Sequence, residues 1–276
     1  MKKKLVVLFL IVALMTATSL SAMAKGKDFT DFEIEEVLFE ATEITDINEL
    51  QNRMKNNIKD DKDLKPELKT EDNLIRNVQD TNQKLKSVKL KNGDIIDSYV
   101  YTAIVTVYDE EYPSQISPLA LYPLPGSNSK YGSSDAASVS YEIRIYYNWI
   151  GNEYIPSIEK YIDPLSCKTT ILSASDSQIS LTSMKASIQA HGDTFYYNGS
   201  NLQRIQPYIT YSDATILNPN DTYRNNVSAY ENTVNYYWSK EVAGTGMYGG
   251  IQLDYIRIPT GQPGTYTDTF LLFGTI

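Results

Sequence analysis

The sequence predicts a mainly β protein: an antiparallel β-sandwich preceded by a short charged helical region. From residue 84 onward, apolar and polar residues alternate in short runs, turn-forming residues separate these runs, and no helical pattern lies between them. The composition also changes near residue 92. All 22 tyrosines lie beyond that point, whereas residues 25–91 hold 16 acidic and 13 basic residues. We therefore divide the chain into a signal peptide (1–24), a charged helical N-terminal region (25–83) and a Tyr-rich sandwich domain (84–276).

The N-terminal segment has the three parts of a secretory signal peptide. Lys2, Lys3 and Lys4 precede the uncharged run 5–14, and the small-x-small pattern of cleavage sites closes the segment at Ala22-Met23-Ala24. We expect cleavage before Lys25 and a secreted, extracellular protein with no membrane span. An uncleaved anchor is the alternative, but the apolar run is short for a span of about 20 residues.

The charged region predicts two helices. Asp46 and Glu49 have the spacing of a capping box, and Ile47, Leu50, Met54 and Ile58 then form one apolar stripe. A second helix is expected from Thr70 or Asp72, carrying Leu74, Ile75, Val78 and Leu85. Residues 28–49 hold nine acids and no base, which favours a solvated helical face over an acidic pro-segment or partner-binding arm.

Strand patterns begin at Lys84. Asn92-Gly93 predicts a hairpin with a type I′ turn, because both residues tolerate a positive φ. The run 139–149 has apolar residues at its odd positions and mostly polar residues at its even positions, as expected for a strand with one face in the core. In the run 179–190 the apolar phase flips, which predicts a β-bulge near Thr182-Ser183.

The chain offers little metal or nucleophile chemistry. With one Cys and one His, a disulfide, a thiolate zinc cluster and a two-imidazole site are excluded, and we expect neither a cofactor nor a metal. Cys167 is interpreted as a buried thiol and His191 as a turn residue. The cluster 109–111 is the best calcium candidate, although solvated charge is favoured there. The net charge of −9 argues against nucleic acid as a partner.

Paired carboxylates keep an enzymatic alternative open. Glycosidases use two carboxyl groups about 5–10 Å apart, and neighbouring predicted strands of this chain carry acids. The alternative is therefore a secreted hydrolase acting on polysaccharide or peptide, with candidates among Glu142, Glu153, Glu159, Asp163, Glu231, Glu241 and Asp254.

The tyrosines favour a binding function. Rings beyond the needs of the core can form an amphipathic surface for sugars, peptides or wall polymers, although strand propensity alone also enriches tyrosine. We expect Trp149 and Trp238 to point inward and the candidate ligand-binding residues to be exposed. These residues are Tyr122, Tyr131, Tyr146, Tyr237 and Tyr248. The favoured function is a non-catalytic extracellular or cell-surface binding protein, with an extracellular polysaccharide, a cell-wall polymer or a protein as partner.

Overall fold

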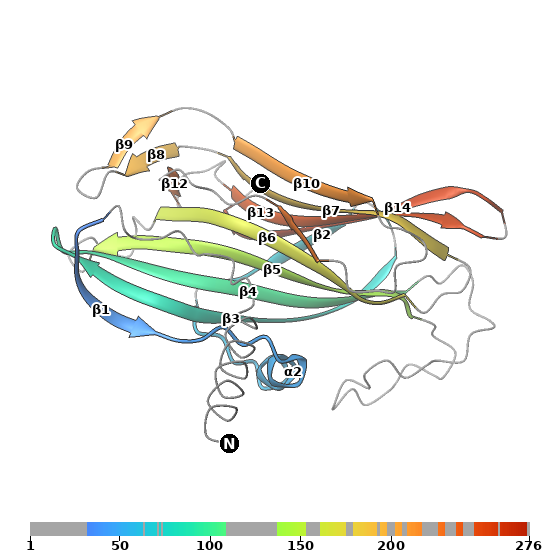
Figure 1. The fold of residues 1–276 in the computed structure, drawn as a ribbon, viewed down its shortest axis with the longest axis horizontal. Coiled ribbons are helices and arrows are strands. Elements are labelled where there is room, and N and C mark those ends of the chain that lie inside the picture. Colours follow the sequence, from blue (N-terminus) through green and yellow to red (C-terminus); the bar gives the residue numbers. More distant parts are fainter. Residues whose placement is uncertain are drawn as a thin grey trace, which may run out of the picture.

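Two antiparallel sheets pack face to face in the computed structural model (Figure 1), which confirms the β-sandwich. The structure describes residues 32–108, 137–152, 161–174, 179–191, 194–197, 202–205, 209–216, 226–229, 236–239 and 246–274, except positions 63, 71, 73 and 259. The elements are β1 (Ile34–Glu40), α2 (Ile47–Lys55), β2 (Glu67–Thr70), β3 (Ile75–Leu90), β4 (Asp94–Tyr108), β5 (Ala137–Asn152), β6 (Tyr161–Ala174), β7 (Ile179–His191), β8 (Thr194–Tyr197), β9 (Leu202–Ile205), β10 (Ile209–Ile216), β11 (Asn226–Ala229), β12 (Tyr236–Ser239), β13 (Gly246–Arg257) and β14 (Pro263–Gly274).

The strands fall into a large and a small sheet. Sheet A has nine strands in the order β1-β3-β4-β5-β6-β12-β8-β9, with β11 also paired to β6. Sheet B has five strands in the order β10-β7-β13-β14-β2. Strand β2 therefore joins the edge of sheet B, whereas β1 and β3, its neighbours in the chain, belong to sheet A.

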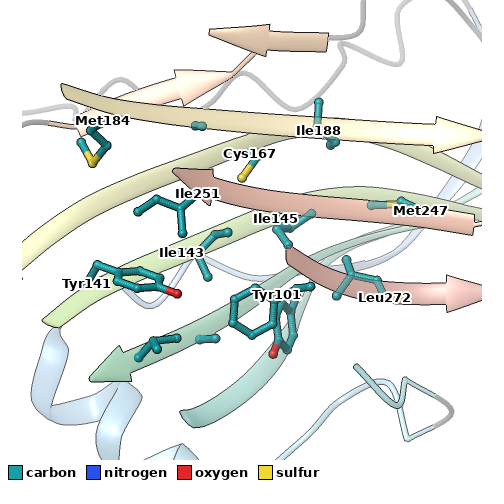
Figure 2. Close-up of a cluster of buried hydrophobic side chains, with 14 of the residues drawn as sticks. Tyr101, Tyr141, Ile143, Ile145, Cys167, Met184, Ile188, Met247, Ile251 and Leu272 are labelled. Carbon is teal, nitrogen blue, oxygen red and sulfur yellow. The ribbon is translucent and has the colours of Figure 1, made fainter. Parts of the chain in front are cut away.

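The main core lies between the sheets (Figure 2). Tyr141, Ile143 and Ile145 of β5 are fully buried there and face Ile251 of β13 and Ile188 of β7. The odd positions of the run 139–149 all lie in this layer, as the alternation predicts. Trp149 is among them and packs edge to face on Phe273 at 4.6 Å between ring centroids.

The other face of sheet A is covered as well. On that side, Leu50 and Met54 of α2 pack on Ile104 of β4, with Ile44 and Ile47 beside them. Figure 1 shows α2 on the side of β3 and β4 away from sheet B. The expectation that the even positions of β5 face solvent is therefore wrong. An antiparallel sheet with one uncovered face leaves such positions in solvent, but here the segment 41–54 covers the polar face.

One of the two predicted helices is present. Helix α2 begins after Asp46, whose carboxylate accepts hydrogen bonds from the backbone N–H groups of Asn48 and Glu49, each at 3.0 Å. The second predicted helix is wrong, because residues 75–90 form β3. No helix among the described residues is long and apolar enough to cross a membrane.

The sequence pattern did not predict strand β3, because most of the side chains on its core-facing side are polar. Arg76 and Asn82 point between the sheets, where an apolar residue would mark a strand, and each is buried with hydrogen-bond partners. Without these apolar positions, the remaining residues Leu74, Ile75, Val78 and Leu85 happen to show a helical spacing. Tertiary pairing overrides that local pattern.

The predicted hairpin is present with a different turn. Gly93 has φ 88° and its N–H donates to Leu90 O at 2.9 Å, while Asn92 is not among the residues with positive φ. This geometry is a type I turn followed by a glycine in the left-handed region, rather than type I′. The predicted bulge is confirmed: Asp254 pairs with Ser183 and Tyr255 with Leu181, so that Thr182 has no partner on β13.

Between α2 and β2 the chain passes around the edge of β3. Lys59 and Asn82 form an isolated parallel β-bridge. The Asn82 side chain accepts a hydrogen bond from Asp61 N at 2.8 Å and donates one to Asp61 O at 2.9 Å. The Asp61 carboxylate accepts a hydrogen bond from Trp149 Nε1 at 2.9 Å, and Leu64 then enters the inter-sheet core. Segment 59–64 therefore connects the outer cover of sheet A to the edge of sheet B.

Close approach of the two sheets requires a glycine on β13. A Cβ at Gly249 would overlap Ile145 Cδ1 and lie 2.5 Å from Ile145 Cγ1, inside the packed core. We expect Gly249→Ala to destabilise the protein by about 1–3 kcal/mol in urea unfolding. Gly151→Ala, whose Cβ would meet nothing within 4 Å, is the control. In an Ile145→Ala background the cost of Gly249→Ala should fall; an equal cost in both backgrounds would contradict the overlap.

Candidate functional site

The five predicted tyrosines do not form one site among the described residues. Tyr122 and Tyr131 lie outside the described residues, and for Tyr237 the structure describes only the backbone, in β12 opposite Phe195. Tyr248 is half-buried on β13 of sheet B. Tyr146 is 6% exposed on β5 of sheet A, so its predicted exposure is wrong. The two described side chains belong to different sheets.

Tyr146 takes part in a buried ionic network under the segment 41–54. Arg144 binds Glu142 with Nε at 2.6 Å and Nη2 at 3.1 Å, and its Nη1 binds the Glu43 carboxylate and Ile44 O. The Tyr146 hydroxyl donates to the same Glu43 oxygen at 3.0 Å. We call Glu43, Glu142, Arg144 and Tyr146 the arginine network.

The arginine network fixes the segment 41–54 on sheet A through the ion pair between Arg144 and Glu43. Burial would lower the pKa of Arg144, but hydrogen bonds and charge from Glu142 and Glu43 outweigh it, so the pKa is raised. Burial and the Glu43 charge raise the pKa of Tyr146. Gln83 adds a backbone clamp, since its amide accepts from Ile44 N at 2.9 Å and donates to Thr42 O at 2.8 Å. All four side chains of the arginine network are thus engaged in holding the segment 41–54 on sheet A.

A second polar cluster joins the two sheets. Arg76 of β3 donates from Nε to Asp268 of β14 at 2.7 Å and from Nη2 to Asp72 at 2.7 Å, and the Tyr141 hydroxyl also binds Asp268. Burial raises the pKa of Asp268, although Tyr141 and Arg76 oppose the shift. For Asp72, burial is outweighed by Arg76 and the Leu74 N–H, so its pKa is lowered. Every carboxylate here is bound by a donor inside the fold.

The described candidates for a carboxylate pair lie apart. Asp163 pairs in register with Asn148, which is six residues along β5 from Glu142, a separation of about 20 Å along the strand. Asp254 lies on the other sheet. The remaining candidates, Glu153, Glu159, Glu231 and Glu241, lie outside the described residues. The described three therefore do not form the pair that glycoside hydrolysis needs.

Metal and thiol chemistry also lack a described site. No group of three His, Cys, Asp or Glu residues able to hold a metal occurs in the described part of the chain. The calcium candidate 109–111 is outside it, as is the side chain of His191. Cys167 is buried between the sheets as predicted, with Sγ 3.9 Å from Gly250 O, and burial raises its pKa to about 12. A thiol with that pKa stays protonated at neutral pH and is a poor nucleophile.

The outer face of sheet B has a different character. Across β7, β13 and β14, the register sets side chains in four rows, and every row carries hydroxyl, amide or carboxylate groups. Apolar residues of the same strands, such as Ile251 and Leu253, point into the core. We call the outward set the hydroxyl face: Ser183, Lys185, Ser187, Gln189, Tyr248, Gln252, Asp254, Thr265, Thr267 and Thr269.

Asp254 is the fixed charge of the hydroxyl face. Ser183 and Thr265, its neighbours on both sides, donate their hydroxyls to its carboxylate, and Gln252 Nε2 donates at 3.0 Å. Burial is outweighed by these bonds and by the charge of Lys185, so the pKa of Asp254 is lowered. The carboxylate therefore stays ionised and immobile at neutral pH, and it orients the hydroxyls around it.

The far end of the hydroxyl face is more apolar. Tyr248 stands between Gln189 and Leu271 in the register, and Lys69 of β2 is close enough to oppose, by its charge, the rise that burial causes in the Tyr248 pKa. In the next row Gly250 has no side chain, and the Ser187 hydroxyl occupies the space that a Cβ would need, with the Thr269 hydroxyl beside it. The face thus combines one aromatic ring with ordered hydrogen-bonding groups.

A pattern in the sequence indicates this face, although the distribution of tyrosines does not. Thr265, Thr267 and Thr269 alternate with Tyr266 and Asp268, which places three hydroxyls on one side of a strand. Aligned with Gln252 and Asp254, the pattern could have indicated a polar sheet face. What the sequence could not supply is the register that brings β7 and β14 to either side of β13.

Removing the cation of the arginine network should destabilise the fold. Arg144→Met leaves the Glu142 and Glu43 carboxylates without their cation in a buried site, and we expect a loss of about 3–5 kcal/mol in urea unfolding. Lys69→Met breaks the exposed pair with Glu67 and should cost no more than about 1 kcal/mol. Adding Glu43→Gln and Glu142→Gln to Arg144→Met should recover part of the loss. Equal losses of unfolding free energy for Arg144→Met and Lys69→Met would show that the buried carboxylates do not depend on Arg144.

Comparison with known proteins gave no match to a family model, to a curated protein or to a solved structure. A function for this chain must therefore be inferred from its own residues and their geometry.

Proposed function

We propose that this protein is a non-catalytic extracellular binding protein and that its hydroxyl face binds an uncharged polysaccharide. The observation that carries the proposal is the ordered row of hydrogen-bonding groups around Asp254, next to the ring of Tyr248. Sugars present many hydroxyls that can both donate and accept. Side-chain hydroxyls and amides offer the same two capacities.

The balance of charge on the hydroxyl face supports a neutral ligand. Asp254 and Lys185 are its two ionisable groups besides Tyr248, and their charges are opposite. A strongly anionic or cationic polymer would find no excess of opposite charge on this face. Tyr248 adds apolar area and a hydroxyl, the combination that suits the two sides of a sugar ring.

The arrangement of the interior polar groups supports binding over hydrolysis. The carboxylates of the arginine network and of the Asp268 cluster are engaged by donors within the fold. Asp254 is likewise held ionised by three donors, so it is poorly suited to act as a general acid. A hydrolase acting through described carboxylates would need a second carboxyl group facing the first.

Binding can be tested by affinity electrophoresis in gels containing xylan, mannan or hydroxyethylcellulose, and by pull-down on chitin. Tyr248→Ala should weaken retention by about 2 kcal/mol without changing the unfolding midpoint. Thr267→Arg should block the face, whereas Thr42→Arg, an exposed threonine on the far side of sheet A, should not. No retention by any of these polymers, or equal loss in both arginine variants, would overturn the proposal. Release of reducing ends would favour the hydrolase.

The extracellular part of the proposal has its own test. If 1–24 is a cleaved signal peptide, mass spectrometry of the protein exported by its own segment should give an N-terminus at Lys25. Ala24→Pro, next to the cleavage point, should leave the precursor uncleaved. A mature protein that starts at Met1 would contradict cleavage and leave the polysaccharide assay unaffected.

A further inference from the structure

Strand β1 stands at the margin of sheet A. Among the described strands it pairs with β3 alone, and Figure 1 shows it beside β3 at the end of the sheet. The register skips Glu35 and Leu38, so neither residue has a backbone pairing partner on β3. One edge of β1 therefore carries backbone N–H and C=O groups that point away from the sheet.

The side chains of β1 are exposed and apolar at its centre. Val37, Leu38 and Phe39 are 49%, 45% and 43% exposed, three consecutive large apolar residues on one short strand. Isolated exposed apolar residues are common, but a contiguous run on a sheet edge marks a surface that pairs with another chain.

The charges of β1 define what such a chain must look like. Two glutamates of β1 pair with lysines of β3, Glu40 with Lys86 at 3.3 Å and Glu35 with Lys89 at 3.5 Å, and just outside the two strands Glu33 pairs with Lys91 at 3.1 Å. These carboxylates remain 53–80% exposed. They can therefore attract a second basic strand from the solvent side.

We propose that the free edge of β1 binds an extended, lysine-rich segment of a partner protein by strand addition. The partner would continue sheet A with backbone hydrogen bonds, place apolar side chains on Val37 and Phe39, and set its lysines against the glutamates. Residues 86–90 of β3, within the run Lys84-Leu-Lys-Ser-Val-Lys-Leu-Lys91, already pair with β1 in this way on its other edge.

A second copy of the chain fits this edge poorly. Two β1 strands paired with each other would bring eight glutamates together, counting four on each from Glu33 to Glu40, in a protein whose net charge is −9. The two irregularities in β1 also disfavour a flat self-pairing. The acids therefore protect the edge against self-association while leaving it open to a basic strand.

The test uses the full-length protein and a fluorescent peptide with the sequence of residues 84–91. Fluorescence anisotropy at low ionic strength should show saturable binding, and the same peptide with every lysine replaced by glutamate should not bind. Leu38→Lys should weaken binding at least about tenfold by adding a like charge at a position without a β3 partner. Ile258→Lys makes a matched change at another aliphatic residue, which is 59% exposed in the turn after β13, and should change binding less than about twofold.

Three results would overturn the proposal. They are the absence of peptide binding to the folded wild type, equal weakening by Leu38→Lys and Ile258→Lys, and a dimer in sedimentation velocity that Leu38→Lys dissociates. The last result would assign the edge to a second copy. Unchanged unfolding midpoints for both variants keep the comparison valid, and the polysaccharide assay on sheet B is independent of each outcome.

Discussion

The contact between Asp61 and Asn82 is the point on which the architecture depends, because there the chain passes from one side of sheet A to the other. Before it, residues 41–55 cover the outer face of sheet A. After it, Leu64 enters the core and β2 completes the edge of sheet B. The Asn82 amide satisfies the backbone of the crossing residue at both its N–H and its C=O, and Trp149 binds its carboxylate. One buried asparagine thus keeps two layers and an edge in register.

Because the chain crosses there, both faces of sheet A are covered, and polar residues are buried on both of them. A sheet with one covered face can leave its polar side in water. Here the polar side of β5 lies under the segment 41–54, so each charge needs a partner: Glu142 and Glu43 are bound by Arg144, and the Tyr146 hydroxyl reaches Glu43. Buried ionic groups of this kind contribute little net stability but are costly to break, and they select one docking position for the covering segment.

Local patterns predicted the features that depend on local chemistry. The cap at Asp46, the hairpin at Gly93, the inward residues of β5 and the bulge at Thr182 each follow from a few neighbouring residues. The failures share another cause. The pattern of β3 is not recognisable because Arg76 and Asn82 take apolar positions and find partners in other segments, Asp268 and Asp61. Tyr146 is buried under a segment about 100 positions away in the chain. Alternation reveals which residues share a face, but not what covers it. The hydroxyl face was likewise hidden, because its composition becomes evident only when three strands are aligned.

The pairing of β2 with β14 has a consequence for how the chain reaches this state. Leu68 pairs with Phe270, and Arg76 contacts Asp268 across 192 positions of sequence. Pairing between strands so far apart in the sequence slows folding, because the long loop between β2 and β14 must close before their contacts can form. A growing chain therefore cannot complete sheet B until β14 has been synthesised. Until then, β2 lacks its partner strand, and part of the core remains open to solvent and to other chains.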